Sequence, residues 1–223
     1  MDNLTLVIPA KNEKESLPEV LEELKNYNLE ILIVLEKEDK ETIESARNYN
    51  CKILYQNGKG YGDALIFGIN SVKTGLFCIF NADGSFDPKE ITKMIEQMNY
   101  EDADFVFGTR YEKNCGSDDD TIITSVGNFI FTKIGNLFFN LNITDILYTY
   151  IIGKTSKAKD LNLSSKDFKF CVELPIKAKR KGCKLVTSKA YERSRIGGKK
   201  KVNVFKDGFM ILLEMIRLFF LRN

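Results

Sequence analysis

Short apolar runs alternate with amphipathic segments along the first half of the chain. Residues 4–9 form an apolar run, residues 16–27 carry apolar side chains at helical spacing, and residues 31–35 are apolar again. This order predicts a strand, a helix and a second strand. The alternation continues with helices predicted at 41–49, 63–72 and 89–98 and strands predicted at 52–55, 76–80 and 104–107. Such a series predicts an α/β fold with a doubly wound, mostly parallel sheet flanked by helices, whose ligands bind beyond the carboxyl ends of the strands.

The pattern changes beyond Gly108. The features of this second half are an acidic loop at 118–120, an apolar segment at 122–139, a helix near 170–180, a strand near 184–188 and an amphipathic helix at 205–221. No internal repeat, low-complexity linker or composition shift divides the chain. We therefore expect a single domain whose C-terminal half supplies the surface for a second substrate.

Composition excludes several classes of function. The 223 residues include 33 Lys and Arg against 31 Asp and Glu, so no global positive field indicates a nucleic-acid partner. The five cysteines are widely spaced and the N-terminus has no signal-peptide pattern, which predicts reduced thiols in the cytosol. The chain has no histidine, so nucleophile–histidine pairs, histidine zinc ligands and imidazole bases are all excluded.

A polar turn directly after the predicted strand at 76–80 carries the strongest chemical signal. Asp83 can present carboxylate oxygens to a divalent cation, with Asn81 two residues before it, and Gly84 lets the backbone come close to a ligand. The turn is thus a candidate seat for a metal-bound diphosphate. The alternative is an Asx-rich turn that caps the helix after Pro88.

Two further loops carry candidate binding groups. The glycines at 58, 60 and 62 open the helix predicted from Asp63, and this turn suits a nucleotide or sugar, although a plain turn with Lys59 in solvent fits equally well. Neither a dinucleotide fingerprint nor a P-loop matches it. Residues 193–201 hold five cations in nine positions, and such a loop can close over phosphates or lie in solvent or on anionic lipid.

Five segments, in this order along the chain, resemble the family 2 glycosyltransferases of GT-A fold. They are Val7 to Glu13, Gly60 to Ala64 with Gly68, Asn81 to Pro88, Gly108 to Tyr111, and Arg195 to Val202. Within that family they most resemble the dolichyl-phosphate or polyprenyl-phosphate sugar transferases. The resemblance implies a nucleotide-sugar-binding half at 1–110, an acceptor-binding half at 111–204 and an amphipathic C-terminal helix at 205–223.

The resemblance also implies roles for individual residues. Those matched to the nucleotide-sugar site are Pro9, Ala10, Asn12, Glu13, Glu36, Lys59, Gly60, Asp63, Asn81, Ala82 and Asp83. The catalytic residues it implies are Asp83, Arg110 and Arg195, with Arg195 and Lys201 on phosphates. Asp83 and Ser85 would hold Mg²⁺ or Mn²⁺. The chain departs from the family at Asn81, which replaces the first Asp of the DxD motif, and at Lys200, where a Ser is usual.

These matches predict an inverting transfer of a sugar from a nucleotide-diphospho-sugar to a polyprenyl or dolichyl phosphate. A lipid phosphate is already an anion and needs no strong base, whereas a hydroxyl acceptor would need a carboxylate base, for which Asp118, Asp119, Asp120 and Asp145 are candidates. The alternatives are a family 2 enzyme that uses a soluble acceptor to build a surface polysaccharide, and a non-catalytic relative that binds nucleotide or membrane.

The apolar helical pattern at 205–221 is interrupted by charges and is too short to span a bilayer, so it suits either the membrane interface or packing on the domain. We expect a cytoplasmic protein, peripheral on the inner face of the membrane. Assembly into a homo-oligomer is left open.

Overall fold

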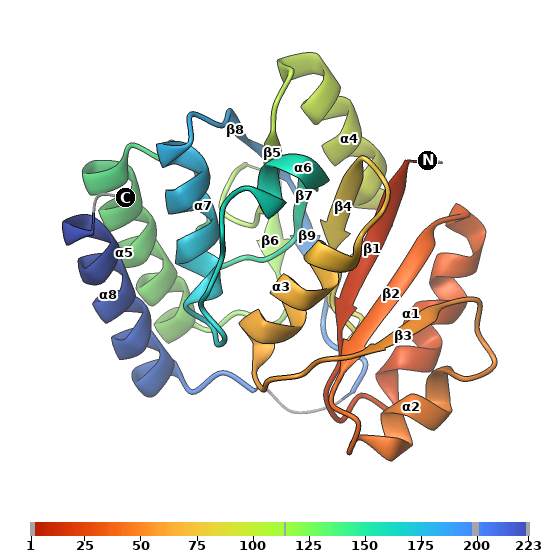
Figure 1. The fold of residues 1–223 in the computed structure, drawn as a ribbon. Coiled ribbons are helices and arrows are strands. Elements are labelled where there is room, and N and C mark those ends of the chain that lie inside the picture. The colour runs from red at the N-terminus through yellow and green to blue at the C-terminus, as the bar shows by residue number, and fades with distance from the viewer. Residues whose placement is uncertain (1–2, 114, 198–200, 222–223) are drawn as a thin grey trace.

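A mixed sheet with helices on both faces forms the centre of the computed structural model, which describes residues 3–113, 115–197 and 201–221 (Figure 1). In sheet order the strands are β3 (Lys52–Tyr55), β2 (Glu30–Leu35), β1 (Leu4–Pro9), β4 (Leu76–Ile79), β7 (Ile151–Lys154), β5 (Phe105–Thr109) and β8 (Leu185–Lys189). All neighbours pair in parallel except β7, which is antiparallel to both β4 and β5. The predicted doubly wound, mostly parallel sheet is confirmed.

Helices cover the two faces of the sheet in separate groups (Figure 1). One face is covered by α1 (Ser16–Leu24), the 3₁₀ helix η1 (Lys25–Tyr27), α2 (Lys40–Ala46) and α4 (Lys89–Glu101). The other face is covered by α3 (Tyr61–Ser71), α6 (Thr155–Lys159), α7 (Phe170–Arg180), α8 (Val204–Phe220) and α5 (Ile122–Phe139). Neighbouring strand residues point to opposite faces, so Leu6 and Ile8 enter one hydrophobic core and Val7 enters the other.

Most predicted elements are present with boundaries shifted by a few residues. The helix predicted at 16–27 ends as an α-helix at Leu24 and continues as η1, and the helix predicted at 41–49 ends at Ala46. Strand β7 was not predicted. It comes from the second half of the chain and pairs with two strands of the first half, so both halves share one sheet. The division of the chain at residue 110 stays a prediction.

Two glycines allow close packing around the central strands. A Cβ on Gly68 of α3 would lie 2.4 Å from Val7 Cγ1 of β1, so the absent side chain lets this helix sit directly on the sheet. A Cβ on Gly153 of β7 would lie 2.6 Å from the Phe105 ring and 2.7 Å from the Phe77 ring. The two rings meet edge to face over β7, with centroids 6.4 Å apart.

A small parallel pair of strands brings together two loops of the second half. Strands β6 (Gly116–Ser117) and β9 (Tyr191–Glu192) pair beside the carboxyl end of the sheet, and the backbone N–H of Asp118 donates to the Glu192 carbonyl at 2.9 Å. The acidic loop at 118–120 and the basic loop after 193 therefore leave the pair next to each other.

Candidate functional site

A cavity of about 610 Å³ lies at the carboxyl ends of the parallel strands. Eleven of the predicted site residues line it: Pro9, Ala10, Glu13, Glu36, Gly60, Asn81, Ala82, Asp83, Arg110, Arg195 and Lys201. Asn12, Lys59, Asp63 and Ser85 are outside its lining. The fold thus gathers into one concave surface most of the positions that the five sequence segments indicated, and their individual roles stay predictions.

The turn after β4 holds the Asp83 carboxylate in a fixed position. Its Oδ1 accepts hydrogen bonds from the Ser85 backbone N–H at 3.0 Å and from the Ser85 hydroxyl at 2.7 Å. Asn81 donates to the same hydroxyl at 3.3 Å. Gly84 has a φ of +81°, and a Cβ there would lie 2.4 Å from Ile196. These contacts occupy Oδ1, so Oδ2 is the oxygen that faces the cations of the site.

Arg195 lies between two carboxylates at this turn. Its guanidinium donates to Asp119 at 2.8 and 3.2 Å, and it lies 3.6 Å from Asp83 Oδ2. The Ile196 N–H donates to the Asp83 carbonyl at 2.8 Å, which ties the basic loop to the turn. Hydrogen bonding to Asp119 raises the pKa of Arg195, although burial opposes the rise.

The position of this guanidinium shows that the site accommodates positive charge, which fits a divalent cation. The described residues contain no group of three or more His, Cys, Asp or Glu side chains able to hold a metal ion. Mg²⁺ is commonly bound by one or two carboxylates together with substrate phosphates and water. Asp83 and the Ser85 hydroxyl beside it supply oxygen donors of this kind, so the residues present fit a metal that binds together with a diphosphate.

The other described cations of the basic loop are also paired. Arg193 donates to both carboxylate oxygens of Glu23 at 2.9 Å and to the Phe86 carbonyl at 2.7 Å, which fixes it against the first half of the chain. Lys201 forms an ion pair with Glu13. The remaining two cations of the loop, Lys199 and Lys200, lie outside the described residues.

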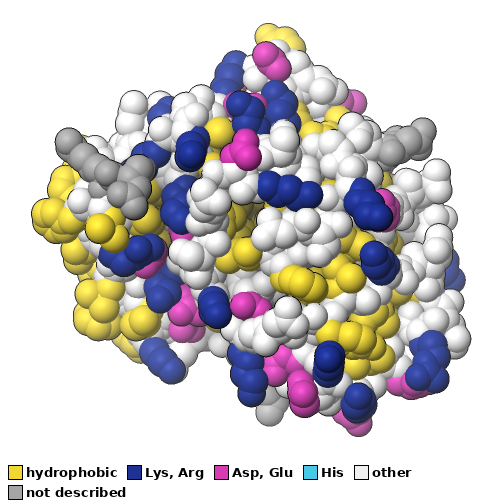
Figure 2. All heavy atoms as spheres, viewed as in Figure 1, with side chains coloured by type: hydrophobic (Ala, Val, Ile, Leu, Met, Phe, Trp, Pro, Cys, Tyr) yellow, Lys and Arg dark blue, Asp and Glu magenta, His cyan; other side chains and the backbone are white. Residues whose placement is uncertain are grey.

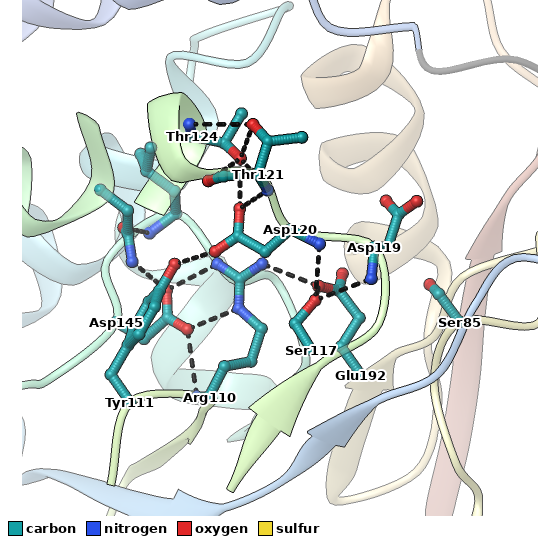
Figure 3. Close-up of polar contacts among 12 residues, drawn as sticks. Ser85, Arg110, Tyr111, Ser117, Asp119, Asp120, Thr121, Thr124, Asp145 and Glu192 are labelled. Carbon is teal, nitrogen blue, oxygen red and sulfur yellow. Dashed lines mark hydrogen bonds and ion pairs between the residues drawn. The ribbon is translucent and has the colours of Figure 1, made fainter. Parts of the chain in front are cut away.

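Arg110 also lines the cavity and is held in a network of buried or half-buried polar side chains (Figure 3). It donates to both oxygens of Asp145, at 2.7 and 3.0 Å, and to Glu192 at 2.9 Å. Its guanidinium also lies over the Tyr148 ring, 4.5 Å from the centroid. Burial alone would lower the pKa of Arg110. The nearby carboxylates of Asp145 and Glu192 have a larger effect and raise the pKa above its usual value. The side chain therefore stays charged and fixed in one orientation.

The four candidate bases differ in their surroundings. Asp145 is fully buried and also accepts from Asn128 at 2.7 Å, so it holds Arg110 and has no access to a substrate. Asp118 accepts from the Tyr191 hydroxyl at 2.6 Å and is outside the cavity lining. Asp119 and Asp120 both line the cavity. Asp120 accepts from the hydroxyls of Tyr111 and Thr124 (Figure 3).

The glycine turn before α3 is packed against a later loop. Asp63 accepts from the Gly58 N–H at 3.1 Å, and its own N–H donates to the Lys166 carbonyl at 3.0 Å. Gly60 has a φ of +104°, and a Cβ there would lie 2.3 Å from that same carbonyl. The turn thus shapes one wall of the cavity through Gly60, while Asp63 stabilises the turn from within.

Several residues that line the cavity were not predicted from the sequence. Gln56 follows β3, Glu192 lies on β9, and Asn128 and Tyr148 contact the Arg110 network from the second half of the chain. The position of Gln56 directly after a predicted strand is a signal that could have found it. Glu192 carries no such signal, because β9 is only two residues long.

The model of the family described as Glycosyl transferase family 2 matches residues 5–161. The chain belongs to this family. An uncharacterized glycosyltransferase of Mycobacterium tuberculosis is 25% identical over 212 residues, which cover 95% of each chain. The low-salt glycan biosynthesis hexosyltransferase of Haloferax volcanii is 24% identical over 92% of this chain and 51% of its own. Dolichol-phosphate mannosyltransferase of Pyrococcus furiosus is 29% identical over 49% of this chain and 34% of its own.

Solved structures share the fold at low sequence identity. Glucosyl-3-phosphoglycerate synthase of Mycobacterium tuberculosis, in complex with Mn²⁺, uridine diphosphate and glucosyl-3-phosphoglycerate, aligns with a TM-score of 0.78 at 12% identity. The alignment covers 97% of this chain and 79% of that one. The predicted GT-A fold and family are therefore confirmed, and the relatives include members of the predicted dolichyl-phosphate branch.

Proposed function

We propose that this family 2 glycosyltransferase moves a sugar, with inversion, from a nucleotide-diphospho-sugar to a polyprenyl or dolichyl phosphate at the cytoplasmic membrane surface. Two relatives support the acceptor class by name, the dolichol-phosphate mannosyltransferase and a UDP-N-acetylglucosamine–dolichyl-phosphate N-acetylglucosaminyltransferase of Methanococcus voltae. The observation that carries the proposal is the position of the cavity beside a large exposed apolar surface.

This surface, the α5–α8 apolar face, is formed by two packed helices and is visible at the left of Figure 2. Its exposed side chains on α5 are Ile122, Ile123, Val126, Phe129, Ile130, Leu137 and Phe138, and those on α8 are Phe205, Phe209, Leu213, Ile216, Phe219 and Phe220. Helix α5 is also the one helix in the described residues that is long and apolar enough to cross a membrane, and 17% of it is buried. A contiguous apolar patch of this kind marks an interaction surface.

The same two helices also border the cavity. Thr124 and Asn128 of α5 and Val204 of α8 line it, while neighbouring residues of each helix face outward on the α5–α8 apolar face. A lipid whose phosphate entered the cavity could therefore keep its hydrocarbon chain against these helices and the membrane. This continuity supports a lipid acceptor over a fully soluble one.

The proposed reaction is a displacement at the anomeric carbon. A phosphate oxygen of the acceptor forms the new bond to that carbon, and the bond to the nucleoside diphosphate breaks. A divalent cation bound at Asp83 would supply charge stabilisation to the leaving diphosphate. Arg195 and Lys201 would neutralise further negative charge. Arg110 donates three of its five N–H groups to described carboxylates, which leaves two for the acceptor phosphate.

A transfer assay tests this function. Purified protein is incubated with polyprenyl phosphate in vesicles, Mn²⁺ and labelled nucleotide sugars, and label is counted after extraction into organic solvent. We expect metal-dependent label in the solvent, and we expect Asp83→Asn to lower turnover at least about 100-fold because it removes a charge at the leaving group. Asp102→Asn is the matched control, since its side chain is 99% exposed.

Each other outcome contradicts a defined part of the proposal. Label confined to an aqueous product would replace the lipid acceptor with a soluble one, for which Asp119 and Asp120 in the cavity would be the candidate bases. Full activity of Asp83→Asn would remove the metal assignment. Absence of turnover with every donor would favour a non-catalytic relative.

A further inference from the structure

Three polar side chains line the cavity at the carboxyl ends of neighbouring strands. Lys11 follows β1, Glu36 follows β2 and Gln56 follows β3. Leu35 and Tyr55 are paired in the parallel register, and the Gln56 N–H donates to the Leu35 carbonyl at 3.1 Å. Glu36 and Gln56 therefore leave the sheet side by side.

The orientation of the Gln56 amide is fixed by its surroundings. Its Nε2 lies 3.2 Å from the Gly58 carbonyl, 3.4 Å from the Gly60 carbonyl and 3.4 Å from Asp63 Oδ2. All three are acceptors, so the reverse orientation would place Oε1 against three oxygens. The residue is 9% exposed, and none of the residues that the structure describes donates to Oε1. Gln56 therefore presents to the cavity a carbonyl oxygen that has no donor among the described residues.

Lys11 and Glu36 complete a defined donor and acceptor order. Lys11 Nζ donates to Glu36 Oε1 at 2.9 Å, and the other carboxylate oxygen has no donor among the described residues. Together the three side chains form a polar row: an ammonium donor from Lys11, a carboxylate acceptor from Glu36 and a carbonyl acceptor from Gln56. The order along this row is donor, acceptor, acceptor.

We propose that the polar row selects guanine, so that the donor in the proposed function, on which this inference rests, is a guanosine diphosphate sugar. The edge of guanine presents O6 as an acceptor and then N1–H and the N2 amine as donors, which matches the row at all three positions. Uracil presents O4 and N3–H in the same way, but its third group, O2, is an acceptor. Uracil would therefore set O2 against the Gln56 carbonyl, and a buried acceptor without a donor is costly.

Calorimetric binding of three nucleotides to the full chain tests the proposal without an acceptor or turnover. GDP, IDP and UDP are titrated in the presence of Mn²⁺; IDP is GDP without the N2 amine. We expect GDP to bind at least about tenfold more tightly than IDP and than UDP, because each lacks the donor for Gln56. Glu36→Gln should reduce the preference for GDP, whereas Glu38→Gln, an exposed neighbour, should leave it unchanged.

A second variant isolates the proposed amide contact. Gln56→Met keeps the length of the side chain but removes the carbonyl, so the ratio of GDP to IDP affinity should fall toward one. UDP binding equal to or tighter than GDP binding would overturn the guanine assignment and leave the proposed transferase standing. Equal affinity of the wild-type protein for GDP and IDP would also overturn it. Failure of all three nucleotides to bind would overturn the proposed function as well.

Discussion

Replacement of Asp145 by Asn tests how much stability the buried Arg110 network contributes. Asp145 is fully buried and accepts four hydrogen bonds: from Arg110 Nε at 2.7 Å, Nη2 at 3.0 Å and backbone N–H at 3.2 Å, and from Asn128 at 2.7 Å. An Asn at this position would remove the negative charge and turn an amide N–H₂ toward groups that are themselves donors.

The expected loss of stability follows from the burial of the pair. Removal of one partner of a buried ion pair costs about 3 to 5 kcal/mol. Glu192 still contacts Arg110 at 2.9 Å and neutralises part of its charge, so we expect the lower end of this range, about 3 kcal/mol. For a domain of this size, about 2 to 4 °C is lost per kcal/mol, so the midpoint of thermal unfolding should fall by about 6 to 12 °C.

Thermal and urea unfolding, followed by circular dichroism at pH 7, measures this effect. The matched control is Asp118→Asn, an exposed aspartate that accepts from Tyr191 at 2.6 Å, and its free energy of unfolding should change by less than about 0.5 kcal/mol. A loss below about 1 kcal/mol for Asp145→Asn, with an unchanged urea slope, would refute the argument that this pair stabilises the fold.

Two further predictions concern the stability of the fold. In Gly62→Ala the new Cβ would lie 2.1 Å from the Ser165 carbonyl oxygen, so we expect the free energy of unfolding to fall by about 2 kcal/mol. In Gly127→Ala nothing lies within 4 Å of the new Cβ, so the free energy of unfolding should rise by about 0.5 to 1 kcal/mol. Thermal unfolding measures both changes. Burial tends to raise the pKa of Glu173, but hydrogen bonds from Lys177, Ser165 and Ser164 outweigh it and lower the pKa below 4.5. Its contribution to stability is therefore complete above the unfolded pKa and is lost as pH falls through the folded pKa. Glu173→Gln should be less stable than the wild type at pH 7, and urea titrations should show the difference shrinking as the pH falls below 4.5.

The parts of the fold that the sequence predicts are those with local periodic signals. Strands β1 and β3 have the predicted boundaries, because each is a short apolar run bounded by polar turns. Asp83 was predicted in the same way, since it lies in the polar turn that follows the buried strand β4, and it does line the cavity. In each case residues that are neighbours in the sequence are enough to predict the element. The rule that ligands bind at the carboxyl ends of strands then predicts where the site lies in the fold.

The acceptor side was harder to predict because its contacts join distant residues. Strand β7 has only four residues and lies between β4 and β5, which are both far from it in the sequence. Arg110 meets Asp145 across 35 positions and Glu192 across 82. No periodicity marks such pairs, so Asp145 was predicted as a candidate base although it is a buried partner of Arg110.

The charges around the cavity predict that binding of the proposed nucleotide-diphospho-sugar requires a metal. Of the described residues in its lining, six are carboxylates (Glu13, Glu36, Asp83, Asp119, Asp120 and Glu192) and four are cations (Lys11, Arg110, Arg195 and Lys201). Each of these cations already contacts a carboxylate. A diphosphate without a metal would therefore be repelled by a lining of net negative charge. It would also have to compete with a carboxylate for each of these cations. A diphosphate that arrives with a divalent cation adds less negative charge and offers Asp83 a partner in place of Arg195, which leaves Arg195 with fewer competing contacts and more able to bind phosphate oxygens.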